Sequence, residues 1–513
     1  MCNCSMFCQI IAAIIFAFIL PFNTIAKEFG AKDDIITTKH CPVNCGCTLE
    51  HTKYPTKPTI PGTTKPTTTT TTTESSSIDE SQPAYPVSLG LFGGSGNDVI
   101  RGVDSFADGS YVVCGTSDSS TGSFAGLTGS EWATPFSFVA KLSKTASLEW
   151  LVTFGSSSGS VTLEDIAVLS DGNIVTVGYS KAYEYSTTPD VEEIELTSEG
   201  IILTLSPSNG ALISQKSVGG KGTDLFNCVS ATSTGFVIGG KTDSDDGDFN
   251  GLSGSNAVIM SFDNSGNISW KRYLGGSKGG SVENIDTDAD NNIYFTCITT
   301  SKDGDFAAFD GLMGGYVDTV VIKYDYSGNY LWDYVIASSG RDQFTAIAAD
   351  GIGGCIVGGN YENISGGTND GTLADIHNCG GIDAVVFRIS SNGQLMWSKL
   401  QSGLDNDFIT DVETIDGGFV VSGYTTSANR DFEAIGNLGG YDSFVTFLEK
   451  SGTIVNMYSY SGSKDDICAG VCSGSGGEVL AVGRTKSTDE AFEGKNSYSN
   501  FTAFTVRYKT ALG

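Results

Sequence analysis

The chain has 513 residues and a formal net charge of −30, with 39% hydrophobic and 17% charged residues. This acidic excess excludes a nucleic-acid partner, which needs a cationic surface, and argues against direct docking on anionic lipid. The 66 Gly and only 11 Pro residues are spread through short apolar runs, a pattern typical of a folded chain of many short strands and tight turns.

The first 26 residues contain an apolar run from Ile10 to Phe22, followed by the small residue Ala26. This pattern predicts a secretory signal peptide over residues 1–26, without the usual basic start, since no Lys or Arg precedes Lys27. An uncleaved signal anchor is the alternative. In both cases we expect the rest of the chain outside the cell, secreted or attached to the cell surface.

Residues 27–51 form a short segment with three clustered cysteines, Cys41, Cys45 and Cys47. With His40 and His51 beside them they resemble a zinc knot, whereas an exported chain favours disulfides, with one cysteine left to pair elsewhere. Residues 52–83 are rich in Thr, Pro and Ser, a composition that buries no core. We expect a disordered, extended linker there.

Residues 84–513 repeat a unit of about sixty residues seven times. Each unit opens with a Gly/Ser-rich turn such as Phe92–Asp98, continues through two strands joined by an Asp-Gly turn, and adds a third strand after a long polar loop. A Ser-Gly-Asn type of turn then leads to a fourth strand, which carries a tryptophan in four units: Trp150, Trp270, Trp332 and Trp397. The units open near Phe92, Phe154, Val218, Leu274, Ile336, Leu400 and Tyr460.

Seven such units predict an all-β fold, a seven-bladed β-propeller of four-stranded antiparallel blades, because no single unit can bury both of its faces. The ends of the domain agree with this prediction. The last unit stops after its third strand, Phe504–Tyr508, and a spare strand, Val87–Leu91, precedes the first unit. We therefore expect this N-terminal strand to complete the last blade and close the ring.

The pattern resembles the Gly/Asp-rich propeller repeats of microbial surface and secreted proteins, over about five-sixths of the chain. The segment Lys323–Trp332 is also similar to the strand–turn–Trp element of quinone-type propellers. The chain departs from those enzymes in unit length and lacks clear cofactor ligands, so no quinone is inferred. The resemblance implies the fold and leaves the function open.

Antiparallel strands bring the opening turns of the blades and the long polar loops to one face of the ring. The opening turns carry an aspartate at equivalent positions in five units: Asp98, Asp224, Asp342, Asp407 and Asp466. We treat these five as candidate ligand-binding residues. The alternative is that each carboxylate holds its own turn by accepting backbone N–H groups.

Two of the long loops contain Asp-Gly-Asp-Phe segments in which carboxylates alternate around a glycine. Such spacing supplies oxygen ligands for Ca²⁺, and the candidate residues are Asp246, Asp248, Asp303 and Asp305. The twelve-residue EF-hand spacing with its closing Glu is absent. The alternative is a simple turn whose phenylalanine packs between blades, and no other cofactor is predicted.

No catalytic motif stands out in the repeated domain, where His377 is the only histidine and no nucleophile elbow or phosphate loop occurs. We expect a binding or adhesion propeller that presents its acidic loops to a protein or glycan ligand. A secreted carbohydrate-active enzyme and a structural surface-coat component are the alternatives. Three sequons matter if the source is a eukaryote: Asn267, Asn363 and Asn500.

Overall fold

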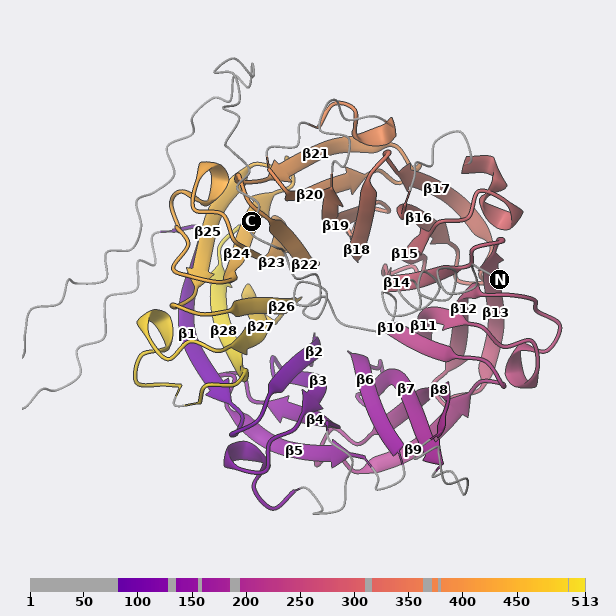
Figure 1. The fold of residues 1–513 in the computed structure, drawn as a ribbon, viewed down its shortest axis with the longest axis horizontal. Coiled ribbons are helices and arrows are strands. Elements are labelled where there is room, and N and C mark those ends of the chain that lie inside the picture. The colour runs from indigo at the N-terminus through magenta and orange to yellow at the C-terminus, as the bar shows by residue number, and fades with distance from the viewer. Residues whose placement is uncertain are drawn as a thin grey trace, which may run out of the picture. The chain divides into compact units, whose positions relative to one another are not determined.

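The computed structural model describes residues 82–127, 135–155, 159–184, 194–309, 316–362, 371–376, 380–496 and 498–512. These residues form seven four-stranded antiparallel sheets arranged in a ring (Figure 1). The prediction of an all-β, seven-bladed propeller is confirmed. The expected signal peptide, Cys-rich segment and most of the linker lie outside the described residues.

Four blades make up the first part of the ring. Blade 1 contains β2 (Asp98–Ser105), β3 (Tyr111–Ser117), β4 (Phe136–Leu142) and β5 (Leu148–Phe154). Blade 2 contains β6 (Gly159–Val168), β7 (Ile174–Glu184), β8 (Ile194–Leu205) and β9 (Leu212–Val218). Blade 3 contains β10 (Asp224–Thr232), β11 (Gly235–Thr242), β12 (Asn256–Asp263) and β13 (Ile268–Gly275). Blade 4 contains β14 (Gly280–Thr287), β15 (Ile293–Thr299), β16 (Asp318–Tyr324) and β17 (Tyr330–Ile336).

Three more blades complete the ring. Blade 5 contains β18 (Arg341–Ala349), β19 (Cys355–Glu362), β20 (Ile382–Ile389) and β21 (Leu395–Gln401). Blade 6 contains β22 (Asp407–Ile415), β23 (Gly418–Thr425), β24 (Asp442–Glu449) and β25 (Ile454–Tyr460). Blade 7 contains β26 (Asp466–Ser473), β27 (Glu478–Thr485), β28 (Thr502–Thr510) and, from the other end of the domain, β1 (Ala84–Phe92).

The ring closes as the sequence predicts. Strand β1 pairs antiparallel with β28, with Leu89 opposite Val506, and so provides the outermost strand of blade 7. The Tyr458 hydroxyl of blade 6 also donates a hydrogen bond to the carbonyl oxygen of Ala84. The first described strand is therefore held by both of the last two blades.

The described helices are short 3-10 turns in the long loops: η2 (Gly122–Phe124), η3 (Gly247–Phe249), η4 (Gly304–Phe309), η5 (Gly371–Leu373), η6 (Arg430–Phe432) and η7 (Glu490–Phe492). Each buries one large apolar residue, as Phe249 does in η3 and Phe306 in η4. The expectation of a turn with an inward phenylalanine is confirmed for both Asp-Gly-Asp-Phe segments. No helix within the described ranges is long and apolar enough to cross a membrane.

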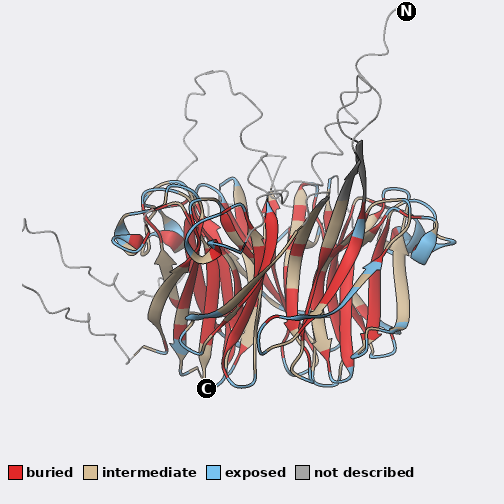
Figure 2. Ribbon diagram, turned by 90° about the horizontal axis from the view of Figure 1, so that it is seen from below, coloured by how far each residue is buried: buried red, intermediate tan, exposed pale blue. Residues whose placement is uncertain are grey.

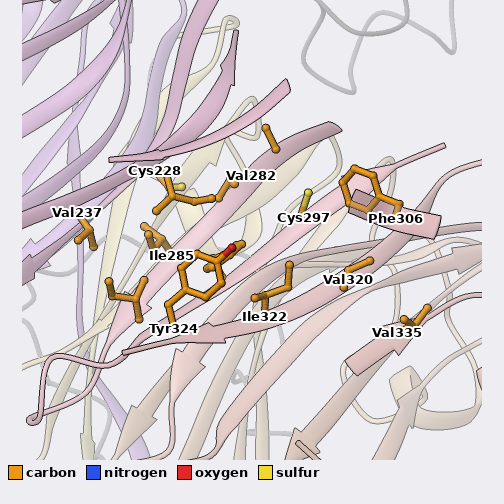
Figure 3. Packing of buried hydrophobic residues seen from close by; sticks show 14 of the residues in the cluster. Cys228, Val237, Val282, Ile285, Cys297, Phe306, Val320, Ile322, Tyr324 and Val335 are labelled. Atoms are coloured by element: carbon orange, nitrogen blue, oxygen red, sulfur yellow. The ribbon is translucent and has the colours of Figure 1, made fainter. Parts of the chain in front are cut away.

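The hydrophobic core lies between the blades, with one cluster at each of the seven blade–blade interfaces. Figure 3 shows the cluster between blades 3 and 4, where Cys228 and Val237 of blade 3 pack with Phe306 and Tyr324 of blade 4. Figure 2 shows buried residues along the strands and exposed residues mainly at the loops on the two ends of the ring. Stacking against its neighbours is thus what buries the faces of each blade.

The four tryptophans occupy outer strands, as predicted, and reach across to the next blade. The indole N–H of Trp150 donates to the carbonyl of Pro207 at 3.2 Å, that of Trp270 to Tyr326 at 3.1 Å, and that of Trp397 to Lys450 at 3.1 Å. Trp332 lies against Gly393 in the corresponding turn of blade 5. Each tryptophan therefore fastens one blade to the turn that precedes the outer strand of the next.

Candidate functional site

The opening turns of the blades and the long loops between second and third strands lie together, and we call the end of the ring that they form the loop face. In blade 1 the backbone N–H of Gly96 donates to Ser119 Oγ at 2.8 Å. In blade 3 the backbone N–H of Lys221 donates to Asp246 Oδ1 at 2.8 Å. The two kinds of loop therefore share one face, as the strand order predicts.

The five aspartates of the opening turns are buried beneath the loop face, each with no exposed surface: Asp98, Asp224, Asp342, Asp407 and Asp466. Each accepts the backbone N–H of the residue four positions earlier at 2.5–2.9 Å, as Asp407 does from Gly403. Burial raises the pKa of Asp407 and of Asp466 to about 6. All five carboxylates hold their turns, and a role for them in ligand binding stays a prediction.

The four carboxylates predicted for calcium also accept backbone N–H groups from the turn that opens their own blade. The donors are Lys221 to Asp246 at 2.8 Å, Gly219 to Asp248 at 3.2 Å, Ser277 to Asp303 at 2.7 Å, and Gly275 to Asp305 at 2.8 Å. The residues that the structure describes contain no group of three His, Cys, Asp or Glu side chains placed to hold a metal ion. These segments therefore fasten the long loop to the opening turn, and calcium binding stays a prediction.

Two of the three sequon asparagines are exposed in described parts of the chain. Asn267 lies in the turn between β12 and β13, where its side-chain amide donates to Asp263 Oδ2 at 2.9 Å. Asn500 donates to the carbonyl of Ser95 at 2.8 Å. Asn363 and His377 lie outside the described residues.

One apolar cluster lies outside the seven blade–blade cores, and we call it the loop-face cluster. It contains Phe408, Tyr424 and Ile467, with Ile382, Tyr441 and Phe501 packed against it. The rings of Phe408 and Tyr424 stack with centroids 4.7 Å apart, and Tyr441 meets Tyr424 edge-on at 5.1 Å. Four of the six lie at the loop-face ends of strands in blades 5, 6 and 7, and Tyr441 and Phe501, which are partly buried, directly precede the third strands of blades 6 and 7.

Unlike the aspartates of the opening turns, the residues of the loop-face cluster and its surroundings differ from blade to blade. The next-to-last residue of the second strand, for example, is Thr116 in blade 1, Lys241 in blade 3, Tyr424 in blade 6 and Arg484 in blade 7. If the blades of a ring were identical, each would bind the ligand equally well. A single binding site therefore requires residues that differ between the blades. The loop-face cluster is therefore a better candidate site than the repeated carboxylates.

Cations border the loop-face cluster. Lys486 Nζ lies 4.2 Å, and the Arg484 guanidinium 4.9 Å, from the centroid of the Phe501 ring. Lys486 also pairs with Asp465 at 3.0 Å, and Arg101 of blade 1, whose charge acts on Arg484, pairs with Glu164 at 2.8 Å. Two of the three cations thus have an acidic partner within the protein.

Arg484 has none. No hydrogen bond or ion pair joins its side chain to any described residue, and its Nε is buried without a partner. Burial lowers the pKa of Arg484 to about 10, and the positive charge of Arg101 acts in the same direction. A half-buried guanidinium without a hydrogen-bonded or ion-paired partner is unusual, and it marks Arg484 as a candidate ligand-binding group.

The inner strands carry a second polar feature, which the sequence analysis missed. Four aspartates each accept a backbone N–H from the inner strand of the following blade: Asp104 from Val168 at 2.7 Å, Asp165 from Val229 at 2.8 Å, Asp286 from Ala349 at 2.8 Å, and Asp411 from Val471 at 3.0 Å. Burial raises the pKa of Asp165 to about 8 and of Asp411 to about 7. The available signal was an aspartate in the middle of an apolar strand, as in Leu163–Ala167.

Comparison with known proteins finds only distant likenesses. No protein-family model and no curated protein matches the chain. Among solved structures it is similar to hydrazine synthase from Kuenenia stuttgartiensis, with 11% identity, a TM-score of 0.45, and coverage of 81% of this chain and 96% of that one. A protein of unknown function from Dyadobacter fermentans has 10% identity, a TM-score of 0.42, and coverage of 83% and 99%.

A third similar structure is the quinohemoprotein alcohol dehydrogenase from Comamonas testosteroni, with 10% identity, a TM-score of 0.38, and coverage of 82% of this chain and 76% of that one. Likenesses this weak carry no argument about this chain.

Proposed function

We propose that this protein is a binding propeller, presented outside the cell on its Thr-rich linker, and that its loop face takes a protein or glycan ligand. The observation that carries the proposal is the loop-face cluster, where aromatic side chains that pack into no blade–blade core lie beside a cation without a partner. Aromatic surface with a few polar groups is typical of binding sites in proteins.

The opposite face supports this choice by contrast. It consists of tight turns such as Asp263–Asn267 and Asp325–Asn329, in which the aspartate accepts the N–H groups of its own turn. Such turns leave little freedom to adapt to a ligand, whereas the long loops of the other face vary in length and composition. The linker expected from the composition of residues 52–83 favours presentation of the propeller at a distance from a surface, since a spacer adds nothing to chemistry.

The test is to screen the purified chain on glycan and protein arrays. We expect at least one class of ligand to bind, and Tyr441→Ala on the loop face to abolish that binding. Tyr326→Ala is the matched control, because Tyr326 is a 49% exposed tyrosine of the opposite face. Uniform silence on both arrays, or binding that Tyr326→Ala abolishes and Tyr441→Ala leaves intact, contradicts the proposal.

A further inference from the structure

The surroundings of Arg484 indicate which chemical group of a ligand the loop face binds. The chain contains 59 Asp and Glu against 29 Lys and Arg, so an acidic partner is available for most cations. The one carboxylate whose negative charge acts on Arg484 is that of Asp465. This carboxylate is already ion-paired with Lys486 at 3.0 Å. Keeping a guanidinium half-buried beside a second arginine costs stability, and this cost is removed when an anion binds.

We propose that Arg484 binds the carboxylate of an acidic saccharide, whose sugar ring lies against the half-exposed rings of Tyr441 and Phe501. This inference rests on the proposed function and specifies the ligand of the same face. The planar fork of a guanidinium matches the two oxygens of a carboxylate, which is why arginine serves this role more often than lysine. Because Nε is buried, the terminal Nη atoms are the donors that meet the ligand.

A peptide is a poorer fit, because the backbone donors of these blades are already used. Extended peptides bind chiefly through main-chain hydrogen bonds. In the opening turn of blade 7 the N–H groups of Gly462, Ser463 and Lys464 donate to side chains of the protein at 2.7, 2.9 and 3.0 Å. Those of Gly403, Leu404 and Asp405 in blade 6 do the same at 2.6, 2.9 and 3.1 Å. What remains for a ligand is a cation and aromatic surface.

The experiment measures binding of D-glucuronate and N-acetylneuraminate to the full chain by saturation-transfer NMR, with glucose as the neutral probe and a short acidic peptide as the competing class. We expect both acidic sugars to bind and glucose to bind more weakly or not at all. Arg484→Met is expected to weaken binding of the acidic sugars about tenfold or more, and Arg484→Lys to restore it only in part. The control is Arg272→Met, which removes an arginine that stacks on Trp270 at 5.3 Å and donates to Gly328 on the opposite face.

The stability of the ligand-free protein is a second measurement. It distinguishes a role of Arg484 in ligand binding from a role in holding the fold. Because the unpaired charge is a cost in the free protein, we expect Arg484→Met to raise the Tm. A lower Tm for this variant assigns Arg484 a structural role and overturns the proposal.

Three further results overturn it: acidic-sugar binding that survives Arg484→Met, equal binding of glucose, or tighter binding of the peptide. If neutral glycans or proteins bind at Tyr441 with no effect of Arg484, the ligand assignment fails while the proposed function stands. If no probe binds on the arrays or in solution, both the ligand assignment and the proposed function fail.

Discussion

A glycine in the middle strand of most blades is required by the neighbouring inner strand. Every inner strand has a β-bulge near its loop-face end, for example between Ile409 and Asp411 in β22. The second-strand residue opposite the bulge is glycine in six blades, and a Cβ there comes within 1.9–2.4 Å of an inner-strand carbonyl oxygen: Gly115, Gly178, Gly240, Gly359, Gly423 and Gly483. The glycine that follows the apolar run of each of these second strands therefore marks a close approach of two backbones.

Replacing Gly423 by alanine tests this requirement. The new Cβ lies 2.0 Å from the Phe408 carbonyl oxygen, so two strands have to separate, and we expect a loss on the order of 3 kcal/mol in the free energy of unfolding, measured with urea. Gly470→Ala is the control, because a Cβ there meets its nearest atoms at 3.4 Å, an ordinary contact, and its backbone is not left-handed. Equal effects of the two substitutions contradict the explanation.

At the scale of elements, β1 closes the ring by joining sequence ends that are more than four hundred residues apart. Ala84 is fully buried, and Leu89 and Leu91 pack against the core between blades 6 and 7. Without β1 the outer edge of β28 is unpaired, and the third strand of blade 7 becomes an exposed edge.

A chain that begins at Gly93 lacks β1, and one that begins at Gln82 retains it. We expect the shorter chain to lose on the order of 4 kcal/mol of stability through lost apolar burial and backbone pairing. The measurement is urea unfolding followed by tryptophan fluorescence, and a peptide of residues 84–92 added in excess should recover part of the loss. Identical unfolding midpoints for the two chains would falsify the role assigned to β1.

The elements could be predicted from the sequence and the site could not, for one physical reason. Strand order, blade count and the closing role of Val87–Leu91 depend on local turns that recur in the repeats. The seven copies therefore make these features recognisable in the sequence. The contact of Arg484 with Phe501, and the hydrogen bond from Val229 to Asp165, join parts of the chain whose spacing follows no motif. The repeated aspartates drew attention as ligand residues because repetition is visible in a sequence, whereas an unpaired cation becomes visible only in three dimensions.

At the scale of the whole molecule, the inner-strand aspartates join neighbouring blades around the centre of the ring, which the inner strands surround (Figure 1). Besides the N–H of the next blade, each accepts the N–H of its own following residue, as Asp411 does from Val412 at 2.9 Å. All four are partly buried, and the charged neighbours that act on their pKa values are other carboxylates. The ring is thus fastened by groups that are easier to protonate than ordinary aspartates.

This arrangement predicts that stability falls as pH rises from about 4 to about 8. Burial raises the pKa of Asp104 and of Asp286 to about 6, of Asp411 to about 7 and of Asp165 to about 8, so across this range the folded state holds more protons than the unfolded chain. Exposed turn aspartates such as Asp263 have lowered pKa values and act in the opposite sense only below about pH 4. Maximum stability is therefore expected near pH 4–5.

The measurement is the free energy of unfolding in urea at pH 4.5, 6.0 and 8.5. After allowance for the partial exposure of the carboxylates, we expect a decrease on the order of 2 kcal/mol or more over this range. Asp165→Asn should flatten the decrease, because the amide cannot lose a proton, whereas Asp263→Asn should leave the slope between pH 5 and 8.5 unchanged. Stability that stays constant or rises with pH over this range contradicts the prediction. It means that the four carboxylates bind protons no more tightly in the folded ring than in the unfolded chain.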